Sequence, residues 1–126
     1  MTTTRRETLR LLVADDNDDM RLLVRATLAI DGRLCVVAEA EDGLTALHAF
    51  REEQPDACVL DYRMPGLTGL EVARQILVER PETLVLIFAA YVPADVLHEA
   101  AALGIHHLRK DLFSDLTGTL LEMAAQ

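Results

Sequence analysis

The chain has 126 residues, and its 12 lysines and arginines against 21 aspartates and glutamates give a net charge of −9 at pH 7. A chain of this length forms one domain of common size and buries a core without disulfides or a structural metal. The negative charge disfavours contact with nucleic-acid phosphates and anionic membrane surfaces, because both depend on lysine and arginine. We therefore expect no direct nucleic-acid binding and no membrane binding by this domain.

Neither the apolar runs nor the N-terminus indicates export or membrane insertion. The longest apolar run has nine residues, 84–92, whereas a membrane-spanning helix needs about 20. Residues 1–7 are polar where a secretory signal carries its apolar segment. We expect a cytoplasmic protein with a disordered tail over residues 1–7 and one domain over residues 8–126.

Short apolar runs alternate with longer amphipathic segments, which is typical of repeated βα units around a parallel sheet. In chain order the pattern predicts a strand at 9–14, a helix at 18–30, a strand at 34–40, a helix at 43–53, a strand at 57–61, a helix at 68–79, a strand at 84–89, a helix at 93–103, a strand at 106–109 and a helix at 114–124. The expected fold class is α/β, with a doubly wound, five-stranded parallel sheet.

Local signals support these boundaries. Pro55 and Pro81 disfavour helix in the residue before them and end the second and third helices, and Gly104 is suited to stop the fourth. The strand at 84–89 is the most apolar, so we expect it to be covered on both faces. The expected inner face of the first helix consists of Met20, Leu23, Val24, Thr27 and Leu28.

The two cysteines, Cys35 and Cys58, both lie within apolar stretches and lack the C-x-x-C spacing of zinc and redox motifs. Free cysteine is among the most buried residue types. We expect two buried, reduced thiols with no redox or zinc role.

Three aspartates fall where two predicted strands end. Asp15 and Asp16 follow the first strand directly, and Asp61 ends the third. Ligands bind open parallel sheets beyond the carboxyl ends of the strands. If the first and third strands are neighbours, as in the flavodoxin-like order 2-1-3-4-5, the three carboxylates meet in one pocket. Such a cluster is unfavourable unless a cation neutralises it.

This cluster has the chemistry of a magnesium site. Three hard oxygen ligands with room for water fit Mg²⁺, which often shares a phosphoryl ligand. A carboxylate beside Mg²⁺ can attack phosphorus and form an aspartyl phosphate. A nearby ammonium would help to neutralise the transferring group, and Lys110, after the fifth strand, is the candidate for that role.

The acidic segment after the first strand also has features of a capped turn and of a calcium loop. An aspartate pair there is often a solvated turn or a helix cap, and the acids that follow suit the first turn of a helix. A calcium loop would place Asp15, Asn17 and Asp19 at its first, third and fifth positions. That loop is excluded because Met20 and Ala26 stand where it needs a glycine and a bidentate glutamate.

Two segments resemble the receiver domains of bacterial two-component response regulators. Residues 12–17 resemble the acidic pair at the family's first strand, and the D-x-R-M-P-G-x-x-G-x-E stretch over 61–71 resembles its phosphoacceptor segment. The resemblance extends from Leu9 to about Ala124. It implies a flavodoxin-like (βα)5 fold, similar to chemotaxis regulators. It also implies phosphotransfer from a sensor histidine kinase or phosphotransfer protein, with no enzymatic turnover beyond self-phosphorylation and slow loss of phosphate.

The resemblance also implies a role for each site residue. Asp61 is the phosphorylated residue and a Mg²⁺ ligand. Asp16 binds Mg²⁺ directly, Asp15 binds it largely through water, and the backbone carbonyl of Arg63 is a further protein ligand. Lys110 contacts the phosphoryl group.

Two positions depart from the family pattern. Ala89 ends the fourth strand, where family members usually carry a Thr or Ser hydroxyl that hydrogen-bonds the phosphoryl group. Losing a charge-assisted hydrogen bond costs about 1.5–3 kcal/mol, which weakens the expected coupling to a conformational change. His107 occupies the aromatic switch position three residues before Lys110, and we expect it to be exposed. Because His106 points to the opposite face, no two-histidine metal site is expected.

A second class of function stays open, that of an atypical receiver that binds a partner without phosphorylation. An enzyme is disfavoured because a dehalogenase-like phosphatase needs an aspartate where Arg63 stands, and glycine-rich nucleotide motifs are absent. A flavodoxin would share the fold, but the acids would repel its phosphate. The resemblance further implies a signalling face on the fourth helix, fifth strand and fifth helix, open to a partner protein, an output domain or a homodimer.

Overall fold

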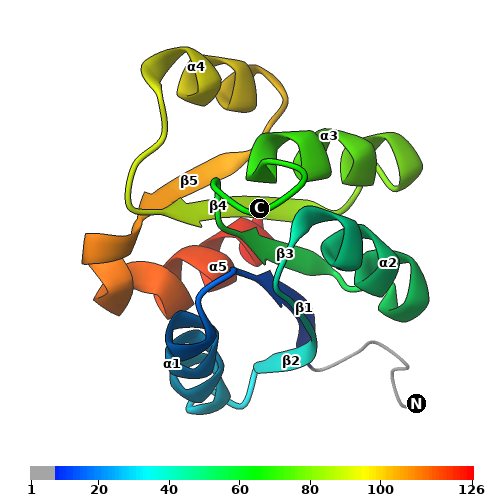
Figure 1. The fold of residues 1–126 in the computed structure, drawn as a ribbon. Helices are drawn as coiled ribbons and strands as arrows, with labels where there is room; N and C mark the ends of the chain where they lie inside the picture. The colour runs from blue at the N-terminus through cyan, green and yellow to red at the C-terminus, as the bar shows by residue number, and fades with distance from the viewer. Residues whose placement is uncertain (1–7) are drawn as a thin grey trace.

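A computed structural model of the protein describes residues 8–126, so the tail predicted over residues 1–7 lies outside the described part. Strands and helices alternate along the described chain (Figure 1). In order, they are β1 (Leu9–Ala14), α1 (Asp18–Ala29), β2 (Leu34–Ala40), α2 (Gly43–Glu53), β3 (Ala57–Leu60), α3 (Gly69–Glu79), β4 (Leu84–Ala89), α4 (Ala94–Ala102), β5 (His106–Arg109), the 3₁₀ helix η1 (Lys110–Asp115) and α5 (Leu116–Ala125).

The strands form one parallel sheet in the order β2-β1-β3-β4-β5. Helices α1 and α5 cover one face, and α2, α3 and α4 lie on the other (Figure 1). The predicted doubly wound, flavodoxin-like fold is therefore confirmed. Because β1 and β3 are adjacent, their carboxyl ends meet at the same edge of the sheet. Within residues 8–126, no helix has both the length and the apolar character required to cross a membrane.

Burial follows the apolar pattern of the inner strands. β3 is buried throughout, and β4 is buried at every position except Leu84. Each face of the sheet has its own core cluster: one includes Phe50 of α2 and Ile76 of α3, and the other includes Leu28 of α1 and Leu120 of α5. Burying one such side chain stabilises the fold by about 1.5–3 kcal/mol. The two core clusters therefore stabilise the sheet that positions the residues at its edge.

Side-chain caps define where three helices begin. The Asn17 side chain accepts a backbone N–H at 2.8 Å at the start of α1. Asp42 and Thr45 form a reciprocal capping box at α2, and Thr68 and Glu71 form another at α3. A good cap is worth about 1 kcal/mol. All three caps lie beside the loops that follow β1, β2 and β3, and they anchor those loops.

Most predicted boundaries agree with the structure to within one or two residues. β3 ends at Leu60, so Asp61 lies just beyond the strand, and α3 begins at Gly69 with Thr68 as its N-cap. The C-terminal helix was predicted from residue 114, but η1 occupies the chain before α5. Leu112 has a non-helical backbone within η1 (φ −99°, ψ 36°), which kinks that segment.

Two predicted core positions are wrong. Cys35 is exposed, because β2 is an edge strand whose middle residues are only partly covered. Cys58 on β3 is buried as predicted, and this burial raises the pKa of its thiol, with a smaller opposing effect of the Arg80 charge. Leu23 is 48% exposed, so the inner face of α1 is carried by Val24 and Leu28.

Candidate functional site

The three predicted aspartates converge at the carboxyl edge of the sheet. Asp15 and Asp16 follow β1, and Asp61 follows β3. One carboxylate oxygen from each lies within 4.8 Å of the other two. The adjacency of β1 and β3 thus brings together acids that are far apart in the sequence.

Asp15 is the buried member of the cluster, with 3% of its surface exposed. Its Oδ1 accepts the Asn17 N–H at 2.9 Å, and its Oδ2 lies 2.6 Å from the ammonium of Lys110. Its own N–H donates to the Ala40 carbonyl on β2 at 3.0 Å. Both carboxylate oxygens of Asp15 are therefore engaged, whereas Asp16 is exposed and open to a ligand.

Asp61 is positioned by its own main chain and its neighbours. Its N–H donates to the Ala14 carbonyl at 2.9 Å, and its Oδ1 accepts the Tyr62 N–H at 2.8 Å. Its Oδ2 lies 3.3 Å from the Lys110 ammonium. Burial raises the pKa of Asp61, and the Asp15 carboxylate raises it further, while Lys110 opposes the rise. The carboxyl group is thus fixed in orientation, with one oxygen directed towards the lysine.

Lys110 follows β5 directly and reaches both acids with a side chain that is 17% exposed. Burial lowers the pKa of its ammonium, but the hydrogen bond to Asp15 and the charges of Asp61 and Asp15 outweigh this, so the pKa is raised. The Lys110 side chain is therefore a charged ammonium.

The donor set fits a divalent cation. The Lys110 ammonium pairs with two of the three carboxylates, those of Asp15 and Asp61, so the cluster keeps an excess of negative charge. Hard oxygen ligands and an open side are what Mg²⁺ requires. An open cavity of about 330 Å³ adjoins the acids, and its lining consists of Asp16, Asp61, Arg63, Ala90, Tyr91 and Lys110. Arg63 thus lines the cavity beside the acids.

Two glycines hold the segment that follows Asp61. The Gly69 N–H donates to the Tyr62 carbonyl at 2.7 Å, and a Cβ on Gly69 would overlap the Asp61 carbonyl oxygen. A Cβ on Gly43, at the start of α2, would overlap Leu67 in the same segment. The starts of α2 and α3 therefore pack closely against the loop that carries Asp61.

Residues 11–115 match the family described as the response regulator receiver domain. The chain belongs to this family. Receiver domains belong to two-component signalling, and the convergence of the acids agrees with the expectation drawn from their positions at the ends of the first and third strands.

This receiver matches part of some relatives and nearly the whole of others. It is 36% identical over 98 residues to the probable transcriptional regulatory protein NarL of Mycobacterium tuberculosis, covering 78% of this chain and 45% of the relative. It is 34% identical over 119 residues to the chemotaxis protein CheY of Listeria monocytogenes, covering 94% of this chain and 99% of that one. The chain therefore spans about half of the NarL relative and nearly all of the CheY relative.

The solved structures agree with the fold. The signal receiver domain of NarL from Mycobacterium tuberculosis superposes with a TM-score of 0.87 at 33% identity, covering 95% of this chain and 98% of that one. The receiver domain of Thermotoga maritima CheB superposes with a TM-score of 0.78 at 27% identity, covering 91% and 92%.

The two unusual positions of this receiver are Ala89, at the end of β4, and His107, within β5. Ala89 is 1% exposed and lies opposite Arg109 of β5 in the sheet. Its side chain is a methyl group, which offers no hydrogen bond. His107 was predicted to be exposed but is half-buried, because it lies opposite Ile87 in the sheet. Burial lowers the pKa of His107, as does the Arg109 charge, and its buried Nε2 has no hydrogen-bond partner.

The sequence did not single out Tyr91 as part of the receiver site. Tyr91 is 64% exposed and lines the cavity beside Asp61. A signal was available, because Tyr91 follows the carboxyl end of β4, at the same edge of the sheet as the acids. His48 and His98, by contrast, are exposed on α2 and α4.

Proposed function

We propose that this receiver takes a phosphoryl group onto Asp61 from the phosphohistidine of a sensor histidine kinase or phosphotransfer protein. It then relays the signal to a partner protein or output domain in the cytoplasm. The proposal rests on one observation: the Asp61 Oδ2 lies 3.3 Å from the partly buried ammonium of Lys110, at the edge of an open cavity. A negatively charged reactant that reaches Asp61 therefore meets a positive charge beside the attacking oxygen.

In the transfer, a carboxylate oxygen of Asp61 attacks phosphorus, and the bond from phosphorus to the donor imidazole nitrogen breaks. The imidazole leaves and takes up a proton from solvent. The Tyr62 N–H holds Asp61 Oδ1 at 2.8 Å, which leaves Oδ2 directed towards Lys110. The Lys110 ammonium neutralises charge on the phosphoryl oxygens.

Mg²⁺ is the proposed cofactor. Asp16, Asp61 and the backbone carbonyl of Arg63 would hold it, with Asp15 contributing through water. When bound, the cation would neutralise negative charge on the phosphoryl group. The engagement of both Asp15 oxygens by protein groups supports an indirect role for that residue.

A second candidate is a binding module that works without phosphorylation. It is favoured by the buried methyl group of Ala89, which offers no hydrogen bond to a phosphoryl group. His107, half-buried at the second switch position, is a further departure. Equal affinity of a partner for the phosphorylated and unphosphorylated chains would favour this candidate, since a modification acts only through differential affinity.

Incubation with Mg²⁺ and acetyl phosphate tests the proposed function without a kinase. We expect one phosphoryl group per wild-type chain and none in Asp61→Asn. Asp95→Asn, an exposed change on α4, is the matched control and should be labelled like wild type. Full labelling of Asp61→Asn at another residue would contradict the assignment.

A further inference from the structure

The guanidinium of Arg21 joins three segments around the site. Arg21 lies on α1 with a side chain that is 14% exposed. Its Nη1 donates to the main-chain carbonyl of Asp15 at 2.5 Å, and its Nη2 pairs with the Asp18 carboxylate. Its Nε lies 3.7 Å from Oε1 of Glu39 on β2. One side chain therefore ties the loop after β1 to both α1 and the edge strand.

The Asp15 carbonyl belongs to the same peptide unit as the N–H of Asp16. The peptide unit before Asp15 is held by its N–H bond to the Ala40 carbonyl, and the one after it is held by Arg21. In the described part of the chain, the Asp16 carboxylate itself has no hydrogen-bond or ion-pair partner. The direction of the Asp16 carboxylate thus depends on the main chain of Asp16. Arg21 fixes that main chain through the Asp15 carbonyl.

We infer that Arg21 is a positioning residue of the site: it fixes the Asp15–Asp16 peptide and so aims the Asp16 carboxylate at the cation. This inference rests on the proposed function, because it assigns a task to Arg21 only if the aspartate cluster binds Mg²⁺. Groups that orient metal ligands from outside the coordination sphere typically account for 10–100-fold in metal affinity.

The positioning role of Arg21 and its positive charge predict opposite changes in Mg²⁺ affinity when the side chain is replaced. Loss of a cation next to an acidic cluster makes the local potential more negative, which by itself strengthens Mg²⁺ binding. Loss of the hydrogen bond to the Asp15 carbonyl leaves the Asp15–Asp16 peptide free to move, and this weakens Mg²⁺ binding. A fall in Mg²⁺ affinity in Arg21→Met therefore indicates positioning and cannot come from the charge.

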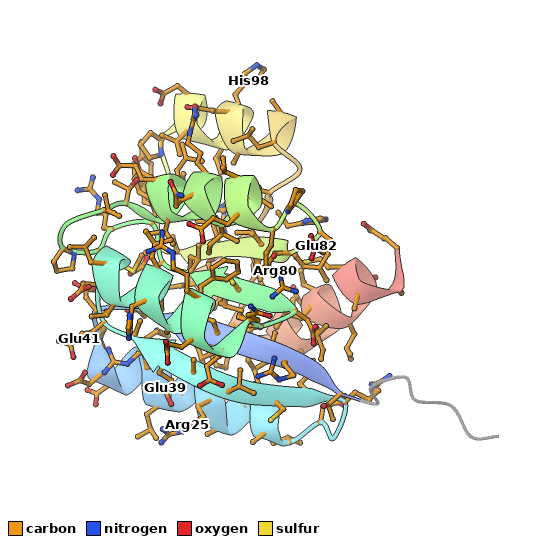
Figure 2. All side chains as sticks on the ribbon, turned by 90° about the vertical axis from the view of Figure 1, so that its right-hand side faces the viewer. Arg25, Glu39, Glu41, Arg80, Glu82 and His98 are labelled. Atoms are coloured by element: carbon orange, nitrogen blue, oxygen red, sulfur yellow. The ribbon has the colours of Figure 1, made fainter. Side chains whose placement is uncertain are left out.

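Arg25 supplies a matched control on the same helix. Its Nη1 lies 2.7 Å from Oε2 of Glu39, so it shares an acidic partner with Arg21, but its side chain is 51% exposed. Figure 2 shows Arg25 and Glu39 next to each other on α1 and β2, at the outer edge of the sheet. Arg25 has no described contact with Asp15 or Asp16, so its removal tests the loss of an arginine that does not reach the loop.

The experiment is a calorimetric Mg²⁺ titration of the full chain as wild type, Arg21→Met, Arg21→Lys and Arg25→Met. We expect the Kd for Mg²⁺ to rise roughly tenfold in Arg21→Met, and to rise also in Arg21→Lys, because an ammonium lacks the fork that contacts three acceptors at once. The Kd of Arg25→Met stays within about twofold of wild type. In metal-free Arg21→Met, the Asn17 amide exchanges faster with solvent than in wild type.

Each alternative result has a definite meaning. An unchanged or lower Kd in Arg21→Met overturns the inference, and so does a wild-type Kd in Arg21→Lys, which would show that the contact of the guanidinium fork with the Asp15 carbonyl, Asp18 and Glu39 is not needed. If Arg21→Met does not fold, the Kd of Arg21→Lys and its Asn17 exchange decide the question. Absence of Mg²⁺ binding by wild type overturns the proposed function itself, and the inference with it.

Discussion

The Lys110 ammonium lies nearer to the buried Asp15, at 2.6 Å, than to Asp61, at 3.3 Å. The short contact to Asp15 anchors the lysine, and the longer one leaves it close to the oxygen that we propose is phosphorylated. Because Asp15 is 3% exposed, this ion pair is shielded from solvent. The lysine is therefore in place before a phosphoryl group arrives.

Removing Lys110 should affect stability and chemistry together. Lys110→Met leaves the buried Asp15 carboxylate without its ionic partner, and breaking such a pair costs about 3 kcal/mol of unfolding free energy. We expect this loss in urea unfolding without Mg²⁺, together with slower labelling by acetyl phosphate. Arg109→Met is the control, because Arg109 pairs with Asp111 on the surface, and an exposed pair contributes at most about 1 kcal/mol. Equal losses in the two variants would contradict the shielding of the pair between Lys110 and Asp15.

The raised pKa of Asp61 predicts a pH-dependent stability. An acid with a raised native pKa binds its proton more tightly when folded, so protonation stabilises the fold and that contribution is lost as the pH rises through the native pKa. Without Mg²⁺ at pH 7, Asp61→Asn should therefore be more stable than wild type in urea. The difference should shrink as the pH falls towards 3.8, the ordinary pKa of the group. A difference that does not vary with pH would count against this explanation.

Gly69 sets the distance between α3 and the loop that carries Asp61. A Cβ at Gly69 would overlap the Asp61 carbonyl oxygen, and backbone has little room to yield. We expect Gly69→Ala to lower the free energy of unfolding by about 3 kcal/mol and to reduce Mg²⁺ affinity. Gly118→Ala in α5 meets no atom within 4 Å, so it should stabilise the protein by about 0.5–1 kcal/mol. A neutral Gly69→Ala would show that the loop can move away from α3.

Ala89 offers a test of the missing hydroxyl. Ala89→Ser places a hydroxyl at a position that is 1% exposed, so the unphosphorylated protein should lose about 1–2 kcal/mol of stability. Once a beryllium fluoride mimic is bound, the hydroxyl gains a charged acceptor, worth about 1.5–3 kcal/mol. We expect a larger mimic-induced rise in Tm for Ala89→Ser than for wild type. Equal rises would show that residue 89 does not reach the phosphoryl group.

The two thiols should differ sharply in reactivity. Cys35 is exposed, while Cys58 is 0% exposed and burial raises the pKa of its thiol. A thiol reagent should therefore modify one cysteine rapidly in the folded protein and the second only after unfolding. Cys35→Ser should abolish the rapid phase. Rapid modification that persists in Cys35→Ser would contradict the burial of Cys58.

The sheet and the acidic edge could be predicted because their signals are local. The apolar run of each strand and the helix-ending signals at Pro55 and Pro81 are read directly from neighbouring residues. The strand order then follows from the family motif around Asp61, and it brings together residues from separate loops. This is why the convergence of Asp15 and Asp61 with Lys110 could be expected before the structure was known.

Other features depend on tertiary packing, which cannot be read from a short stretch of sequence. The apolar run around Cys35 predicts burial, but β2 lies at the edge of the sheet and leaves the thiol exposed. His107 is polar, yet its place on β5 opposite Ile87 half-buries it. Arg21 could not be recognised because its main target is the backbone carbonyl of Asp15, and a carbonyl has no sequence signature.

The most direct test is to locate the phosphoryl group by mass spectrometry on fragments of the chain, after incubation with acetyl phosphate in the presence and absence of Mg²⁺. We predict a single modified fragment, the one that contains Asp61, and labelling that requires Mg²⁺. A phosphoryl group on any other fragment, or equal labelling without Mg²⁺, would contradict the proposed role of this site.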